Sequence, residues 1–115
     1  MAEERMMKLQ EIVDCCSGLN VTEKRCISED FVELVFYTEE IEAWHRILTA
    51  FLGTPQKPEG QQPTQKDLEI TKTTGGIRLD QTLFEKEFEN GAIIAKFWPW
   101  KDKIHITLRM ALLSR

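Results

Sequence analysis

Residues 83–113 constrain the fold most, because they read as consecutive β-strands joined by short turns. Asn90-Gly91 lies between two runs rich in apolar residues, and this dipeptide is the strongest short-range signal of a two-residue type I′ hairpin turn. One face of the resulting hairpin is mostly apolar and the other mostly charged. The predicted register pairs Glu89 with Ala92, Phe88 with Ile93, Glu87 with Ile94, Lys86 with Ala95, Glu85 with Lys96 and Phe84 with Phe97.

The run that follows this hairpin continues the alternation. Apolar residues occupy every second position of 104–112, and His105, Thr107 and Arg109 lie between them. A period of two is expected of a half-buried strand, so residues 98–103 become the turn of a second hairpin. The apolar face of this meander is predicted to hold Phe84, Phe88, Ile93, Phe97, Ile104, Ile106 and Leu108.

Residues 81–89 have a second interpretation as a short helix. Asp80 would cap this helix and Asn90-Gly91 would end it. Glu and Lys also form helices more readily than strands. The strand interpretation is preferred, because the hairpin register gives the two phenylalanines of this stretch apolar partners.

The N-terminal half predicts two helices and a hairpin. Residues 3–17 carry apolar side chains at helical spacing, among them Met6, and Gly18 follows where a C-terminal cap belongs. Residues 21–28 and 31–37 are predicted to pair as strands around a turn at 29–30. Thr38 is the expected N-cap of a second helix that ends near Leu52, before Gly53.

Residues 54–66 contain three prolines and almost no apolar residue, which predicts a flexible surface loop. A short strand is expected at 68–73, and the strand pattern resumes at 77–79 after a break at Gly75-Gly76. Together these elements predict one α+β domain, 1–115. We expect a two-layer sandwich whose mainly antiparallel sheet, an N-terminal hairpin plus the C-terminal meander, has two helices packed on one face.

Length and cysteine content limit the class of protein. A chain of 115 residues is long enough to bury a core without disulfides or a structural metal. No apolar run approaches the roughly 20 residues of a membrane-spanning helix, which argues against a membrane partner. Three cysteines without paired spacing favour a reducing cytoplasm.

The net charge of −4 is unevenly distributed. Residues 1–52 carry 11 acidic and 5 basic groups, whereas residues 53–115 carry 8 acidic and 10 basic groups. The acidic balance argues against a binder of duplex nucleic acid. The basic end of the meander favours an acidic partner.

Tryptophans and cations alternate at the tip of the second hairpin. Pro99, between Trp98 and Trp100, cannot donate to a β-ladder, and at least one of these indoles is hard to bury completely. Such a surface suits an acidic protein segment, an anionic ligand or single-stranded nucleic acid. The alternative is that both tryptophans fold back over the edge of the helices as lids on the core. The candidate binding residues are Lys96, Trp98, Trp100, Lys101, Lys103 and Arg109.

A second candidate site would bind an anion. Residues 105–108 resemble the His-x-Thr-apolar tetrad of two-histidine phosphoesterases, but those sites need a second copy and His45 has no hydroxyl two residues on. The paired glycines in 73–78 can direct backbone N–H groups at an anion, although they more often make a turn or a bulge. This alternative site consists of Arg78, His105, Thr107 and Arg109.

Metal and cofactor chemistry is not predicted. Cys15, Cys16 and Cys26 lack the spacing of a metal or redox motif, and adjacent cysteines on a helix point about 100° apart. The thiols are expected to be buried or incidental, with a reactive Cys15 as the alternative.

We therefore expect a small cytoplasmic interaction or regulatory module without catalysis, whose partner docks on the charged sheet face and the tip at 98–103. The alternative is an anion-binding or phosphoester-processing domain. A third possibility is a homodimer formed by strand addition, if the last strand of the meander is an edge.

Overall fold

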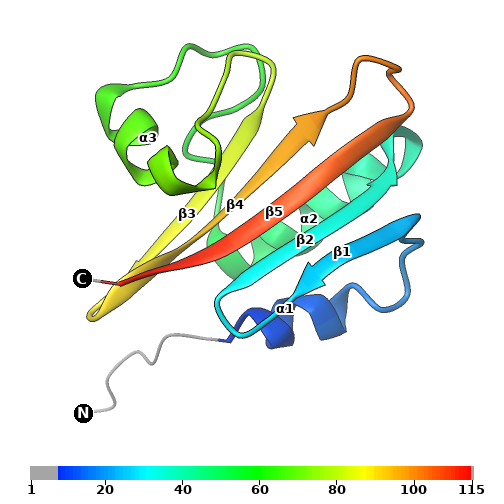
Figure 1. The fold of residues 1–115 in the computed structure, drawn as a ribbon, viewed down its shortest axis with the longest axis horizontal. Helices are drawn as coiled ribbons and strands as arrows, with labels where there is room; N and C mark the ends of the chain where they lie inside the picture. The colour runs from blue at the N-terminus through cyan, green and yellow to red at the C-terminus, as the bar shows by residue number, and fades with distance from the viewer. Residues whose placement is uncertain (1–7, 115) are drawn as a thin grey trace.

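The computed structural model describes residues 8–114 and shows a five-stranded antiparallel sheet with helices on both faces (Figure 1). The strand order in the sheet is β1-β2-β5-β4-β3. The predicted α+β architecture is therefore confirmed, as is the strand interpretation of the stretch after Asp80. The strands are β1 (Glu23–Ile27), β2 (Phe31–Tyr37), β3 (Thr82–Phe88), β4 (Gly91–Pro99) and β5 (His105–Ser114).

The last strand of the meander, β5, lies in the middle of the sheet. The possibility that it forms an edge is therefore wrong, because β2 returns from the N-terminal half and pairs with residues 105–111 of β5. The edge strands are β1 and β3 instead. β1 has an irregularity between Lys24 and Cys26, and Lys57 pairs with Leu83 on β3. Both features disfavour the addition of a further strand.

The register of the β3–β4 hairpin differs from the predicted one by two residues. Phe88 lies opposite Gly91, so Glu89 and Asn90 form the turn, and neither has the positive φ of a type I′ turn. Gly91 also pairs with Ser114 of β5, so Gly91 belongs to the β-ladder and not to the turn. The two turn residues are therefore one position earlier in the chain than predicted. An even shift leaves the two faces of the hairpin unchanged, because side chains alternate with a period of two.

Two helices, α1 (Leu9–Cys15) and α2 (Ile41–Leu52), cover one face of the sheet (Figure 1). Trp44 of α2 stacks on Phe36 of β2, with ring centroids 4.6 Å apart. None of the helices within residues 8–114 is long and apolar enough to cross a membrane. The core between these helices and the sheet contains Leu9, Ile12, Cys16, Val32, Leu34, Phe36, Trp44, Leu48, Leu52, Phe84, Phe88, Ile93, Ala95, Phe97, Ile106, Leu108 and Met110.

Several predicted boundaries shift. The start of the first helix, with Met6, lies outside the described residues, and the helix ends before Gly18, with Cys16 as its C-cap. Thr38, the predicted N-cap of the second helix, instead begins a 3₁₀ turn, η1 (Thr38–Glu40), that precedes α2. No side chain within the described residues caps this turn. Ile104 was predicted in the core but is 55% exposed, because β5 begins only at the next residue.

The predicted strands at 68–73 and 77–79 are wrong. The first stretch forms the end of α3 (Gln65–Ile70) and the 3₁₀ turn η2 (Lys72–Thr74), and the second is irregular. A capping box explains the helix: the Thr64 hydroxyl accepts from the Asp67 N–H at 3.1 Å, and the Asp67 carboxylate accepts from the Thr64 N–H at 2.9 Å. These reciprocal bonds stabilise the start of a helix that runs into the stretch predicted as a strand.

Replacing Thr64 with alanine is expected to lower the free energy of unfolding by about 1 kcal/mol, since the cap loses one of its two bonds. Urea denaturation measures the change. Thr73→Ala is the matched control, because Thr73 is exposed and should give a change within about 0.5 kcal/mol. Equal stabilities of the two variants would contradict the capping role.

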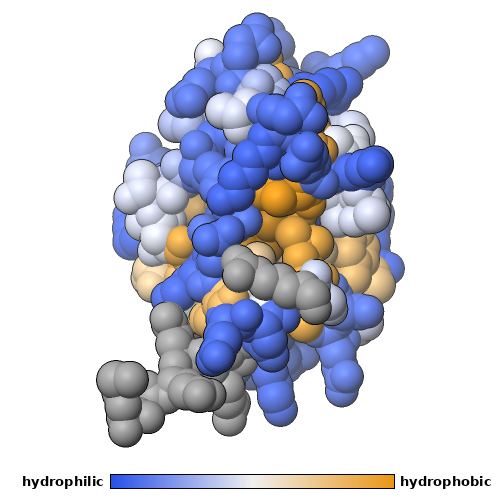
Figure 2. All heavy atoms as spheres, turned by 90° about the vertical axis from the view of Figure 1, so that its left-hand side faces the viewer, coloured by the Kyte–Doolittle hydropathy of each residue, from blue (hydrophilic) through white to orange (hydrophobic). Residues whose placement is uncertain are grey.

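α3 lies on the opposite face of the sheet from α1 and α2. Ile70 packs there against a second cluster formed by Ile77, Leu83, Ile94 and Ala111. Figure 2 shows apolar side chains reaching the surface among hydrophilic ones on the side of the molecule that lies to the left in Figure 1. This outer face of the sheet is therefore partly covered rather than fully solvated.

Lys57 is fully buried within the predicted surface loop at 54–66. Its ammonium donates to the carbonyl oxygens of Pro58 at 3.0 Å, Leu79 at 3.2 Å and Gln81. Three carbonyls match the three N–H bonds of the ammonium. The side chain thus ties the loop before α3 to the loop before β3, and burial lowers the pKa of Lys57.

Candidate functional site

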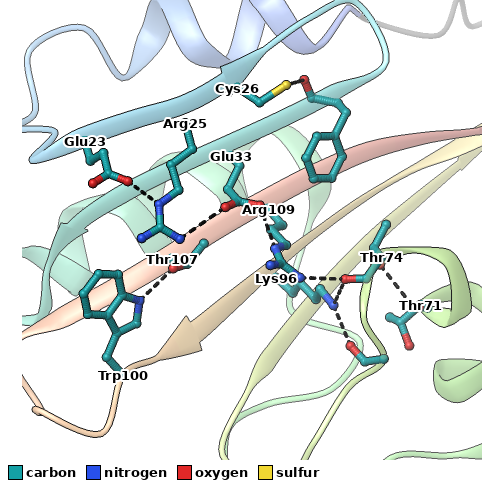
Figure 3. A network of polar contacts seen from close by, with 12 residues as sticks. Glu23, Arg25, Cys26, Glu33, Thr71, Thr74, Lys96, Trp100, Thr107 and Arg109 are labelled. Carbon is teal, nitrogen blue, oxygen red and sulfur yellow. Dashed lines mark hydrogen bonds and ion pairs between the residues drawn. The ribbon is translucent and has the colours of Figure 1, made fainter.

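Lys96 of β4 and Arg109 of β5 lie opposite each other and both contact one turn (Figure 3). Lys96 Nζ donates to the carbonyl oxygens of Thr74 and Gly76, each at 2.6 Å. Arg109 Nη1 donates to the same Thr74 oxygen at 3.0 Å. The glycine turn, a candidate for presenting N–H groups to an anion, thus presents carbonyl oxygens to two cations.

We call residues 71–78 the strap, because they cross the outer face over Lys96. Gly75 has φ of 99°, and a Cβ at this position would lie 2.8 Å from Arg109 Nη1 and 3.5 Å from the Trp98 ring. A larger residue is therefore strained by the positive φ and would also require the Arg109 guanidinium to shift. The close approach of the strap leaves Lys96 only 1% exposed.

Glu33 of β2 connects Arg109 to the far edge of the sheet. Arg109 Nε donates to one oxygen of Glu33 at 2.9 Å, and Arg25 Nη1 donates to the other at 3.4 Å. Arg25, in the irregular part of β1, also pairs with Glu23. Arg25 and Glu33 were not predicted as site residues, because these ion pairs depend on which strands are neighbours and no local pattern predicts strand order.

Trp98 is surrounded by three cations. The guanidinium carbon of Arg109 lies 4.7 Å from a Trp98 ring centroid, and that of Arg78 lies 5.1 Å from one. Lys96 Nζ lies 5.6 Å from a Trp98 ring centroid. These distances are within the range of cation–π attraction. Arg78 is exposed, and no carboxylate within the described residues forms an ion pair with it.

Trp100 covers the neighbouring part of β5. Its Nε1 donates to the Thr107 hydroxyl at 2.7 Å, and its ring lies 4.8 Å from the His105 ring. The Arg25 guanidinium lies 5.3 Å from the Trp100 ring. His105 Nδ1 is 2.7 Å from an oxygen of Asp102. The imidazole and the buried Thr107 hydroxyl are thus both engaged within the protein.

A groove of ≈ 890 Å³ runs over these tryptophans, and we call it the tryptophan groove. Arg25 comes from one edge of the sheet and Arg78 precedes the strand at the other edge, so they reach the tryptophans from opposite sides. Of the residues that the structure describes, three cations and one carboxylate line the groove. The lining residues are Arg25, Arg78, Leu79, Asp80, Trp98, Pro99, Trp100 and Lys101.

The predicted candidates thus fall into three groups. Trp98, Trp100, Lys101 and Arg78 line the groove. Lys96 and Arg109 lie below the strap and hold it. The remaining candidates are placed elsewhere: His105 and Thr107 lie against Trp100, and Lys103 is exposed at the hairpin tip with φ of 61°.

Both tryptophans lie on the face opposite α1 and α2. On β4, Trp98 follows Lys96 and Ile94 at alternate positions, and Ile94 belongs to the cluster on the outer face. Trp100 bonds to Thr107, which is paired with Trp98. The indoles therefore do not cover the edge of the helices, which was the alternative role predicted for them.

The other reactive side chains have local roles. His45 packs against Phe84, with ring centroids 5.3 Å apart, and lies 3.3 Å from the Thr49 hydroxyl. Burial raises the pKa of Cys16 to about 11, whereas Cys15 and Cys26 are exposed free thiols. Within residues 8–114, no three His, Cys, Asp or Glu side chains are placed to hold a metal ion.

Comparison with known proteins finds no matching protein-family model, curated protein or solved structure.

Lys96 gives a prediction about pH. Burial, and then the nearby Arg109, lower the pKa of Lys96 from 10.5 to about 8. The folded protein therefore releases this proton at a lower pH than the unfolded chain, so the Lys96 contribution to the free energy of unfolding rises between pH 8 and 10.5. We expect Lys96→Met to remove about 1 kcal/mol of the change in unfolding free energy between roughly pH 7 and 9.

Urea denaturation at several pH values in this interval tests the prediction. Lys72→Met, at an exposed position in η2, serves as the control and should keep the wild-type pH dependence. An identical pH dependence for Lys96→Met and the wild type would show that Lys96 titrates as an ordinary lysine.

Proposed function

We propose that this protein is a cytoplasmic, non-catalytic interaction module, and that an acidic segment of a partner protein docks in the tryptophan groove. The observation that carries the proposal is the pair of half-buried tryptophans on the groove floor, each with an arginine against its ring. Tryptophan and arginine are the residues most enriched among those that dominate binding energy at protein interfaces.

The arrangement of Arg78 favours a carboxylate ligand. A guanidinium that contacts an indole is held in place by the ring, while its N–H groups stay available for bidentate bonding to a carboxylate. Arg78 has no such partner among the described residues, so an acidic side chain entering the groove gains a charge-assisted bond without displacing an internal one. Lys101 adds a second cation at the same groove.

The lining of the groove supports binding rather than catalysis. Among residues 8–114, its side chains include one carboxylate, Asp80, and no histidine, cysteine, serine or threonine. General acid–base and nucleophilic catalysis use such side chains, positioned against the reacting group. His105 and Thr107, the residues of the alternative phosphoester site, contact Asp102 and Trp100 instead of lining the groove.

The proposal is tested by titrating the protein with a synthetic peptide that contains glutamate and leucine residues. We expect saturable binding that weakens as salt rises, because part of it is electrostatic. Arg78→Gln should weaken binding about tenfold, which corresponds to about 1.4 kcal/mol. Lys72→Gln removes the same charge from η2, outside the groove, and should leave the affinity unchanged. Equal affinities for both variants would refute docking in the groove.

A further inference from the structure

Building on the proposed function, we infer that the tryptophan groove selects a segment with an acidic residue on each side of an apolar stretch. The lining has this order across the sheet: a cation, an aromatic and proline floor, then a second cation. Arg25 lies against Trp100 at one side, and Arg78 lies against Trp98 at the other. A segment that crosses the floor meets both arginines.

The spacing of the floor sets the spacing of the two acidic residues. Trp98 lies on β4, and Trp100 directly follows this strand, with its N–H bonded to the His105 carbonyl oxygen. Two positions of extended backbone place their Cα atoms about 6–7 Å apart. Arg25 and Arg78 reach them from opposite sides, so the two guanidinium groups are further apart than that. An extended segment advances about 3.3 Å per residue. Two acidic residues separated by three apolar residues span about 13 Å and point to the same side as the central apolar residue, so all three can face the groove.

The two ends of the groove differ in their electrostatics. Arg25 already pairs with Glu23 and Glu33, so an incoming carboxylate must share this guanidinium with internal acids. Arg78 has no acidic partner among the described residues. The acidic residue that meets Arg78 therefore contributes more to affinity than the one that meets Arg25.

Three synthetic peptides of related sequence test the inference. The first has glutamate, leucine-proline-leucine and glutamate in that order, with neutral flanks. The second has the same composition with both glutamates at one end, and the third replaces the leucine-proline-leucine centre with serine-glycine-serine. We expect the first peptide to bind at least tenfold more tightly than either of the others, by isothermal titration calorimetry.

Double-mutant cycles then assign each acidic residue to its arginine. Each glutamate of the first peptide is changed to glutamine and measured against Arg25→Gln and Arg78→Gln. One glutamate should couple to Arg25 and the other to Arg78, with the larger coupling at Arg78. Either direction of the peptide satisfies the inference. Both glutamates coupling to one arginine, or neither coupling, would overturn it.

The outcomes separate this inference from the proposed function. If all three peptides bind equally well, and Arg78→Gln weakens each of them, the acidic docking site stands and the selected pattern is refuted. If none of the peptides binds, or if Arg78→Gln has no effect on any of them, the docking site itself is refuted. Circular dichroism of each variant establishes that a loss of binding is not a loss of fold.

Discussion

Replacing Lys57 with methionine is expected to lower the free energy of unfolding by about 3 kcal/mol. Methionine fills a similar volume, so the loss comes from polar groups rather than from a cavity. The buried Gln81 carbonyl oxygen loses its donor, and a buried acceptor without a partner costs about 1–3 kcal/mol. The part-buried oxygens of Pro58 and Leu79 lose a bond to a charged group but keep the N–H groups of Gln61 and Gly60. Urea denaturation of the two proteins measures the difference.

Lys72→Met provides the matched control for this variant. It makes the same chemical change at an exposed position of η2, where the expected effect is within about 0.5 kcal/mol. A decrease below about 1 kcal/mol for Lys57→Met would mean that water replaces the ammonium without penalty. The buried lysine would then not be what holds the two loops together.

Replacing both Trp98 and Trp100 with alanine is expected to weaken binding of the acidic peptide at least 30-fold, or about 2 kcal/mol. The change removes the floor of the groove and the rings that hold Arg25 and Arg78. Binding is measured by calorimetry, and the stability of the same sample by urea denaturation. The two quantities must be separated, because Trp98 also packs under the strap.

Tyr37→Ala is the control for this experiment. Tyr37 is an exposed aromatic residue on the same face of the sheet, 40% accessible and in contact with the His105 ring, but it does not line the groove. Its replacement should leave the affinity unchanged. Large destabilisation of the double tryptophan variant with unchanged binding would make the indoles structural and would end the docking proposal.

The sequence predicted most of the sheet because local periodicity determines which side chains face the core. Except at Ile104, the alternation in the meander assigns the core-facing side chains correctly, and those faces survive the two-residue error in the hairpin register. The position of β5 could not be predicted in this way, because local patterns do not specify strand order. The error at α3 had a local signal, since the spacing of Thr64 and Asp67 is that of a capping box.

The candidate site was predicted in part for similar reasons. Local composition indicated the tryptophans and the basic residues around them. The burial of Lys96 was missed, because its partners are carbonyl oxygens of the strap, which lie 20 and 22 residues away in the chain. Charged residues were expected to be exposed on this face, but backbone acceptors allow a lysine to be buried there.

The location of the docking site is the central claim, and the three tryptophans allow it to be tested directly. Each indole N–H gives its own signal in a heteronuclear NMR spectrum of the labelled protein. Addition of the glutamate-leucine peptide should shift the signals of Trp98 and Trp100, whereas Trp44, fully buried between α2 and the sheet, should not respond. Binding that leaves the Trp98 and Trp100 signals unchanged would contradict the account.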